Sequence, residues 1–217
     1  MFLKVYLTDI SPLYDDEVFE RYYKEALHYR KKKVDGLKLK KPKCQSLGAG
    51  VLLKKALEDV GVESDFEISN KGKPELKSNK SHVLFNLSHS GDRAMCVISD
   101  CPVGCDVETV KENKRVADRF FTEAEANLAN RSAADFTRIW TLKESFIKTT
   151  GEGLGRVLES FSLDFDRDEN VKGVIVDGIA RKEFSFYELN YDDGYRYALC
   201  VKGDTKGVEP QVEWVKL

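Results

Sequence analysis

The segment from Val103 to Glu108 alternates apolar and acidic residues, and this alternation constrains the fold more than any other feature of the chain. Side chains repeat every two residues along a strand, so Asp106 and Glu108 project from the same face of a sheet. The plain interpretation is the wet face of a half-buried antiparallel sheet. The alternative is a pair of hard oxygen ligands on a rigid element, which suits magnesium beside a phosphate.

A second motif, Trp140–Lys148, has helical periodicity. A four-residue step brings Trp140, Glu144 and Lys148 onto one stripe. The side expected to face the core carries Ile139, Leu142 and Phe146. A Glu–Lys pair at this spacing is also common as a surface ion pair worth about 0.3–0.5 kcal/mol. Trp140 either packs against the neighbouring half of the protein or lines a pocket.

The chain has 217 residues, which is enough for one large domain or two small ones. Its 35 basic and 37 acidic residues give a net charge of −2, which argues against nucleic acid and against an anionic membrane as partners. The charge is uneven, because the stretch Tyr29–Lys43 contains a single acid, Asp35, among many lysines. This stretch is either a solvated face or an anion-attracting rim.

Cysteine usage and hydropathy indicate the compartment. The five cysteines are odd in number and match no zinc-binding spacing. The start at Met1 lacks the apolar region of a signal peptide, and no stretch approaches the roughly 20 apolar residues that span a bilayer. We therefore expect a protein of the reducing cytoplasm, with no membrane partner.

Periodicity and turn residues predict a mixed order of elements. In the first half we expect a strand at 2–7, helices at 15–33 and 43–59, and a hairpin of strands 83–90 and 93–99. In the second half we expect a strand at 103–108, helices at 115–119, 123–130 and 135–150, and strands at 161–165, 184–189 and 195–201.

A short internal repeat suggests how these elements are organised. Ala94-Met95-Cys96-Val97 resembles Ala198-Leu199-Cys200-Val201, and each is expected to be the return strand of a hairpin. We therefore predict an α+β fold of two similar halves related by a pseudo-two-fold axis, each with helices packed on a small antiparallel sheet. The predicted halves are residues 1–102 and 103–217.

Two further segments contain residues typical of phosphate contacts. His89 lies between Ser88 and Ser90 before a turn, where it is either a hydrogen-bonded structural residue or a donor to a phosphate oxygen. In Gly72-Lys73-Pro74 the glycine permits a close backbone approach and the proline fixes the exit of the turn. We expect this turn to direct Lys73 toward a ligand bound beside it.

Four segments occur in an order that resembles the signature of the 4′-phosphopantetheinyl transferases of the surfactin-synthetase-activating type. They are Lys71–Pro74, Phe85–Ser90, Gly104–Glu108 and Trp140–Lys148, and Phe120–Glu125 resembles the family's segment between the last two. The resemblance implies transfer of the 4′-phosphopantetheine arm of coenzyme A to a serine of an apo carrier protein (acyl, peptidyl or polyketide), with release of adenosine 3′,5′-bisphosphate. It also implies a monomer that serves fatty acid or secondary metabolite biosynthesis.

The resemblance further implies a role for each matching residue. Asp106, Glu108 and Glu144 would hold Mg²⁺ on the pyrophosphate of coenzyme A, and Glu144 would deprotonate the serine, directly or through water. The residues implied to contact coenzyme A are Lys43, Lys73, Pro74, Ser88, His89, Lys143 and Lys148. The half 1–102 would bind its nucleotide, and the half 103–217 would hold the metal and dock the carrier.

One departure and two alternatives accompany this hypothesis. The family usually has an arginine just before the segment Leu47-Gly48, whereas here Lys43 is the nearest cation and lacks the bidentate fork of an arginine. A metal-dependent phosphodiesterase or nuclease uses similar acids, although the acidic net charge argues against a polynucleotide. A non-catalytic module that binds coenzyme A or a carrier has no need of three carboxylates.

Overall fold

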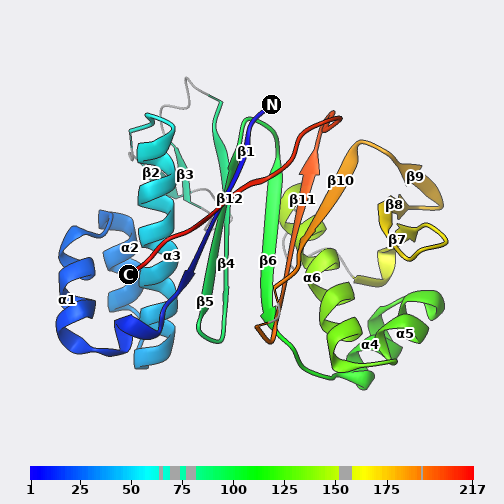
Figure 1. Cartoon of the computed structure of the whole chain (residues 1–217), viewed down its shortest axis with the longest axis horizontal. Coiled ribbons are helices and arrows are strands. Elements are labelled where there is room, and N and C mark those ends of the chain that lie inside the picture. The colour runs from blue at the N-terminus through cyan, green and yellow to red at the C-terminus, as the bar shows by residue number, and fades with distance from the viewer. Residues whose placement is uncertain (64–65, 69–73, 77–81, 152–157, 192) are drawn as a thin grey trace. The chain divides into compact units, whose positions relative to one another are not determined.

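The computed structural model describes residues 1–63, 66–68, 74–76, 82–151, 158–191 and 193–217 (Figure 1). The chain divides into two compact units. The N-terminal unit is Phe2–Asp100 with Gln211–Leu217, and the C-terminal unit is Cys101–Pro210 with Met1. The predicted division near residue 102 differs from this one at the end of the chain, where the last seven residues, predicted to belong to the second half, lie in the N-terminal unit.

The reason for this difference is a strand that periodicity did not indicate. β12 (Gln211–Trp214) pairs in parallel with β1 (Leu3–Asp9) at the edge of the N-terminal sheet. Thr8 reinforces the junction, because its Oγ1 donates to the carbonyl of Val215 at 2.7 Å. All four residues of β12 are exposed, so its sequence carries no burial pattern.

The N-terminal unit is built on the sheet β12-β1-β5-β4. The other two strands are β4 (Leu84–Ser90) and β5 (Arg93–Ser99), and the helical elements are η1 (Ser11–Tyr14), α1 (Asp16–Glu25), α2 (His28–Asp35) and α3 (Lys40–Asp59). A separate ribbon pairs β2 (Phe66–Ile68) with β3 (Pro74–Leu76). Strand β5 pairs antiparallel with both β1 and β4, which confirms the predicted hairpin.

The helix predicted at 15–33 is two helices. Asp15 caps α1 by accepting from the backbone N–H groups of Glu17 and Val18. The backbone is extended at Ala26 and Leu27, whose side chains pack against the core of this unit. The helix is interrupted here, where these two apolar side chains pack against the core. Neither glycine nor proline marks the interruption in the sequence.

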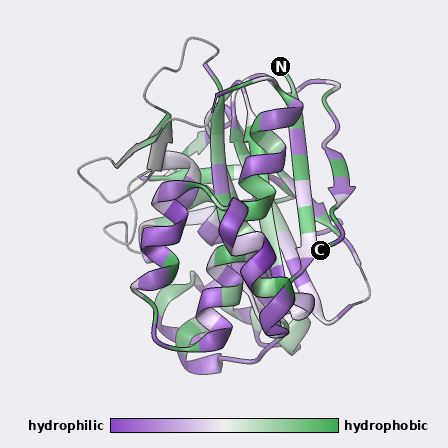
Figure 2. Cartoon of the chain, turned by 90° about the vertical axis from the view of Figure 1, so that its left-hand side faces the viewer, coloured by the Kyte–Doolittle hydropathy of each residue, from purple (hydrophilic) through white to green (hydrophobic). Residues whose placement is uncertain are grey.

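Helix α3 supplies most of the helical side of this core. Its Leu47, Leu53 and Leu57 are fully buried in one cluster with Tyr6 of β1 and Ile98 of β5. In Figure 2 hydrophilic and hydrophobic residues alternate along the helices, as expected for helices with one face on a core and one in water.

The C-terminal unit is built on the three-stranded antiparallel sheet β10-β11-β6. Its strands are β6 (Val103–Thr109), β10 (Phe184–Leu189) and β11 (Tyr195–Lys202), and its helical elements are α4 (Lys114–Phe120), α5 (Glu123–Ala129), α6 (Ala133–Thr150) and η3 (Leu158–Ser160). A second sheet joins β7 (Phe161–Phe165), β8 (Val171–Val176) and β9 (Ile179–Arg181). Strands β8 and β9 were not predicted.

Within the C-terminal unit, Trp140 packs in an apolar cluster and stacks on Phe136 with ring centroids 6.1 Å apart. These contacts lie within one unit, so packing of this tryptophan against the neighbouring half stays a prediction.

The two units share one connectivity. Each starts with a strand, continues through helices and ends in a hairpin whose return strand, β5 or β11, pairs antiparallel with the first strand. The internal sequence repeat lies in these two return strands. This arrangement confirms the predicted α+β fold of two similar halves, whereas the pseudo-two-fold axis stays a prediction. None of the helices in the described ranges is long and apolar enough to cross a membrane.

Candidate metal and phosphate site

Helix α6 lies directly on strand β6 because Gly104 has no side chain. A Cβ atom at this position would lie 2.3 Å from the carbonyl oxygen of Ser145 and 2.5 Å from the backbone nitrogen of Thr149. Ser132 caps the start of the helix by accepting from the N–H of Asp135, and Gly151 ends it with a φ of 69°. This close contact brings the Asp106 face of β6 to the polar stripe of α6.

Asp106 and Lys148 form the centre of the site. The carboxylate of Asp106 is only 4% exposed, and the ammonium of Lys148 donates to its Oδ1 at 2.7 Å. The same ammonium donates to the carbonyl of Cys105 at 3.0 Å. Burial alone would lower the pKa of Lys148, but its effect is outweighed by the charge of Asp106, the hydrogen bond to Asp106 and the charges of Cys105 and Glu144 taken together, so the pKa lies above its ordinary value. Lys148 is therefore a charged partner of a buried carboxylate.

Glu144 adds a third charge beside this pair. It is half-buried on α6, four residues before Lys148. Burial raises its pKa, and the negative charges of Asp106 and Glu108 raise it further against the opposing effect of Lys148. The carboxyl group of Glu144 therefore lies within electrostatic range of both strand acids.

Glu108 occupies the outer end of the acidic row. Its side chain is 21% exposed and pairs with Lys111 at 3.1 Å. Arg196 of β11 lies directly opposite Glu108 in the sheet register. Lys111 was missed by sequence reasoning, although its position three residues after Glu108 is a signal that can be seen in the sequence.

The donor set of this site fits a hard divalent cation. Burial contributes most to the raised pKa of Glu144, and repulsion by Asp106 and Glu108 adds to it; a bound dication would relieve that repulsion. In the described ranges, no three His, Cys, Asp or Glu side chains are already arranged as a metal-binding group. Carboxylate oxygens are the ligand type that Mg²⁺ prefers, and Mg²⁺ commonly takes few protein ligands and keeps water or substrate oxygens in its other positions.

Lys143, which was predicted to contact coenzyme A, requires a correction. Its side chain is 0% exposed, and its ammonium donates to both carboxylate oxygens of Glu125 at 2.9 Å and to the carbonyl of Phe161 at 2.8 Å. Burial lowers the pKa of Lys143, opposed by the charge of Glu125. With its donors satisfied inside the core, this lysine is a structural residue and does not face a ligand.

Glu125 is the partner that sequence reasoning overlooked. It also accepts from the backbone N–H of Thr122 and of Leu163, both at 2.9 Å. The segment Thr122–Glu125 forms a complete capping box at the start of α5. That motif was a usable signal for the position of Glu125, whereas its second role as the partner of Lys143 depends on tertiary packing.

Three of the residues predicted to bind coenzyme A lie in the N-terminal unit. Ser88 and His89 are consecutive on β4, so their side chains point to opposite faces, and Ser88 is 6% exposed whereas His89 is exposed. Lys43 lies in the first turn of α3. That turn meets the β4–β5 hairpin, because Gln45 Nε2 donates to the carbonyl of Gly91 at 2.9 Å. Lys43 and His89 thus belong to neighbouring segments of one unit.

The remaining predicted contacts are described only in part. Lys73 lies outside the described residues, and Pro74 is the first residue of β3, where it is opposite Ile68 in the ribbon. The expectations for these two residues stay predictions.

The basic stretch 29–43 is not a uniformly solvated face. Arg30 is 3% exposed, its Nη2 donates to the hydroxyl of Tyr29 at 3.0 Å, and its Nη1 lies 3.5 Å from the hydroxyl of Ser46. Its aliphatic stem packs on Gly50, where a Cβ would lie 2.6 Å from Cγ of Arg30. Arg30 therefore ties α2 to α3, and the lysines of the stretch carry its exposed charge.

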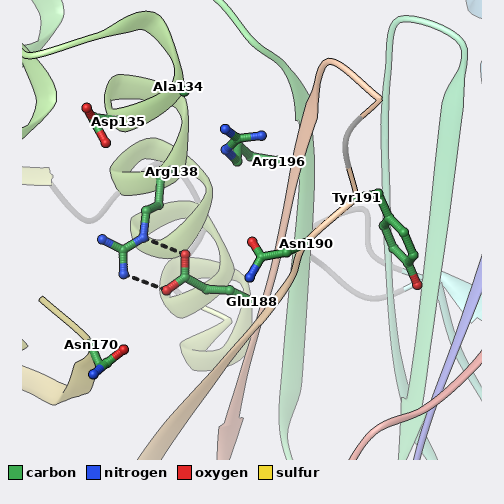
Figure 3. Close-up of a pocket in the computed structure, with 8 residues that line it drawn as sticks. All are labelled: Ala134, Asp135, Arg138, Asn170, Glu188, Asn190, Tyr191 and Arg196. Atoms are coloured by element: carbon green, nitrogen blue, oxygen red, sulfur yellow. Dashed lines mark hydrogen bonds and ion pairs between the residues drawn. The ribbon is translucent and has the colours of Figure 1, made fainter. Parts of the chain in front are cut away.

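A polar cavity of about 530 Å³ lies beside the first two turns of α6 (Figure 3). Arg138 forms two hydrogen bonds with Glu188 of β10, at 2.6 Å and 2.7 Å, and a third with the carbonyl of Glu169 at 2.8 Å. Arg196 also lines this cavity, which contains both signs of charge. The Arg138–Glu188 pair fastens the start of α6 to the edge of the sheet, and so supports the position of Glu144 further along the helix.

Comparison with known proteins identifies relatives of this chain. Residues 102–200, which contain β6 and α6, match the model of the 4′-phosphopantetheinyl transferase superfamily. The chain is 36% identical over 143 residues to the 4′-phosphopantetheinyl transferase psf-1 of Bacillus pumilus (63% of this chain and 60% of that one), and 35% identical over 122 residues to Sfp of Bacillus subtilis (54% of each). It is 35% identical over 171 residues to the 4′-phosphopantetheinyl transferase HetI of a Nostoc species, with 72% of this chain and 69% of that one covered.

The chain therefore belongs to the 4′-phosphopantetheinyl transferase superfamily. It spans 60% of the length of psf-1 and 54% of that of Sfp.

Proposed function

We propose that the protein transfers the 4′-phosphopantetheine arm of coenzyme A to a serine hydroxyl of an apo carrier protein and releases adenosine 3′,5′-bisphosphate. The observation that carries this proposal is the meeting of Asp106 and Glu108 with Glu144 beside the ammonium of Lys148. These residues lie in the segment that matches the superfamily. Relatives of this chain are named for the same transfer.

Asp106, Glu108 and Glu144 would hold Mg²⁺, which when bound neutralises the pyrophosphate of coenzyme A and stabilises the charge on the departing phosphate. Lys148 lies next to this carboxylate set, so its ammonium can contact the same phosphate oxygens. A lysine delivers a compact charge to such oxygens without the fixed geometry of an arginine.

Glu144 is the residue of this set best suited to accept the proton of the serine. A general base must lie within hydrogen-bond reach of the proton that it accepts, and in the metal-free protein burial and the neighbouring acids raise the pKa of Glu144. Asp106 is less suited, because its Oδ1 already accepts from Lys148.

For the nucleotide of coenzyme A we propose contacts from the N-terminal unit. Lys43 lies in the first turn of the 20-residue helix α3, whose amino end favours anions. His89 is exposed on β4 and Ser88 precedes it, while Lys73 and Pro74 complete the proposed set. Lys43 then supplies the charge that the family usually takes from an arginine.

We further propose that the protein acts as a monomer in the cytoplasm. The odd number of cysteines and their lack of a zinc-binding spacing support a reducing compartment. The carrier class, whether acyl, peptidyl or polyketide, is the part of the substrate that a panel of apo carriers would define.

Intact-mass spectrometry of an apo carrier incubated with coenzyme A and Mg²⁺ tests the proposal. The wild-type protein should add one phosphopantetheine arm to the carrier, whereas Asp106→Asn and Glu144→Gln should slow this by a factor of about 10²–10³ or more. Glu112→Gln is the matched control, because Glu112 is an exposed acid just beyond β6 and should not affect the rate. Full activity of both site variants would refute the assignment.

The same samples separate the alternatives. Release of adenosine 3′,5′-bisphosphate without any carrier would indicate a phosphodiesterase. Binding of coenzyme A with no modification of any carrier in the panel would indicate a non-catalytic module.

A further inference from the structure

Lys148 occupies the carboxylate that a divalent cation would need. Its ammonium lies 2.7 Å from Oδ1 of Asp106, and the Asp106 side chain is only 5% exposed. An ammonium and a dication that seek the same oxygen repel each other and compete for it. The cation can therefore bind both oxygens of Asp106 only if this ammonium moves away, and it can bind Oδ2 alone only against repulsion by the ammonium on Oδ1.

The backbone and Cβ of Lys148 are fixed by packing, whereas the rest of its side chain is partly exposed. A Cβ at Gly104 would lie 2.8 Å from Cβ of Lys148, so the helix and the strand touch at this point. Thr149 Oγ1 locks the same turn by donating to the carbonyl of Cys200 at 2.9 Å. The Lys148 side chain is nevertheless 27% exposed, so its four-carbon stem can swing toward solvent without movement of α6.

A displaced ammonium needs a new anion. Lys148 leaves Asp106 only at the cost of losing a charge-assisted hydrogen bond, unless another acceptor is within reach of its stem. The polyphosphate of the substrate in the proposed reaction provides such acceptors. The Lys148–Asp106 ion pair thus couples binding of the metal to binding of the substrate.

We propose that Lys148 competes with the divalent cation for Asp106, so that the cation binds weakly alone and binds cooperatively with the polyphosphate that takes over the ammonium. The part concerning the polyphosphate rests on the proposed function, whereas the competition for Asp106 does not. Because coupling between two ligands is reciprocal, the cation strengthens binding of coenzyme A by the same factor.

Titration with Mn²⁺, monitored by the electron paramagnetic resonance signal of the free ion, tests the competition without any reaction. Lys148→Met keeps the length of the side chain and removes the ammonium, and should bind Mn²⁺ about tenfold more tightly than wild type, within the 5–150-fold range usual for coupled sites. Lys148→Arg should stay near wild type. Lys172→Met is the matched control, because Lys172 pairs with Asp166 at the surface of the same unit.

Coenzyme A supplies the second arm of the test, with the Mn²⁺ bound by coenzyme A in protein-free buffer subtracted. Coenzyme A should raise the affinity of wild type for Mn²⁺ by a larger factor than that of Lys148→Met. Asp106→Asn in the Lys148→Met background should abolish the tight binding, which assigns it to this site.

Mn²⁺ affinity of folded Lys148→Met equal to or weaker than that of wild type would overturn the inference, as would equal enhancement by coenzyme A in both proteins. If Lys148→Met fails to fold by circular dichroism, Lys148→Gln replaces it under the same criteria. Transfer to a carrier is measured separately, so failure of this competition leaves the proposed function standing.

Discussion

Lys143 and Glu125 form a buried ion pair in the C-terminal unit, with the ammonium 2.9 Å from both carboxylate oxygens. Consecutive helical residues are about 100° apart, so burial of Lys143 in the core directs Glu144 away from the core and toward β6. The pair is therefore one of the buried contacts, with those of Leu142 and Phe146, that fix the rotation of α6 about its axis. Lys143, next to the proposed catalytic acid Glu144, therefore has a structural role in the core.

Removal of either member of this pair should destabilise the protein strongly. Lys143→Met leaves the carboxylate of Glu125 buried without its ammonium partner, and we expect a loss of about 3–5 kcal/mol in the free energy of unfolding, measured in urea. Below the unfolding transition its affinity for coenzyme A should equal that of wild type. A specific loss of coenzyme A affinity with unchanged stability would restore the ligand-binding role for Lys143.

Gly104→Ala should disturb both stability and transfer. The added methyl group would lie 2.3 Å from the carbonyl oxygen of Ser145, so α6 must shift away from β6, at a cost of about 1–3 kcal/mol. Gly36→Ala is the control, because its nearest contacts, at 3.6 Å, are ordinary and its φ is −69°. Thermal unfolding of both variants, with the carrier assay, checks this. Equal unfolding temperatures would show that the helix–strand contact is not tight.

The Arg138–Glu188 pair should show measurable coupling, because both side chains are about a quarter exposed and two hydrogen bonds join them. A double-mutant cycle with Arg138→Met and Glu188→Gln should give a coupling energy of about 1 kcal/mol in urea unfolding. The more exposed pair Arg131–Glu169 should give less. A larger value for the exposed pair would contradict the role of Arg138 as the fastener of α6.

Stability should depend on pH through Glu144. Because its pKa is raised above the ordinary value of 4.5, the folded protein keeps a proton that the unfolded chain releases. The contribution of this group to the free energy of unfolding is fully present below pH 4.5 and falls as pH rises toward the pKa of folded Glu144. Over this pH range the stability of Glu144→Gln should rise relative to that of wild type. Mg²⁺ should reduce the difference in the free energy of unfolding between the two proteins. If the unfolding temperatures of wild type and Glu144→Gln change in parallel with pH across this range, the pKa of folded Glu144 is not raised.

Local sequence patterns predicted much of the fold of this protein. Alternation in Val103–Glu108 and helical spacing in Trp140–Lys148 predicted β6 and α6, together with the faces on which Asp106 and Glu144 lie. Both patterns are set by neighbours within a few residues, so the sequence alone is sufficient to read them. The repeated return strands likewise indicated two similar α+β halves.

Tertiary structure decided what depends on residues distant in sequence. Strand β12 exists because it adds to β1, about 200 residues away, and its exposed residues leave no periodic trace. Lys143 was expected to contact coenzyme A because it matches a position of the family's motif, and only the packing of α5 and β7 around it shows that its ammonium lies in the core. A buried charge needs a partner, and spacing along the chain does not state where that partner comes from.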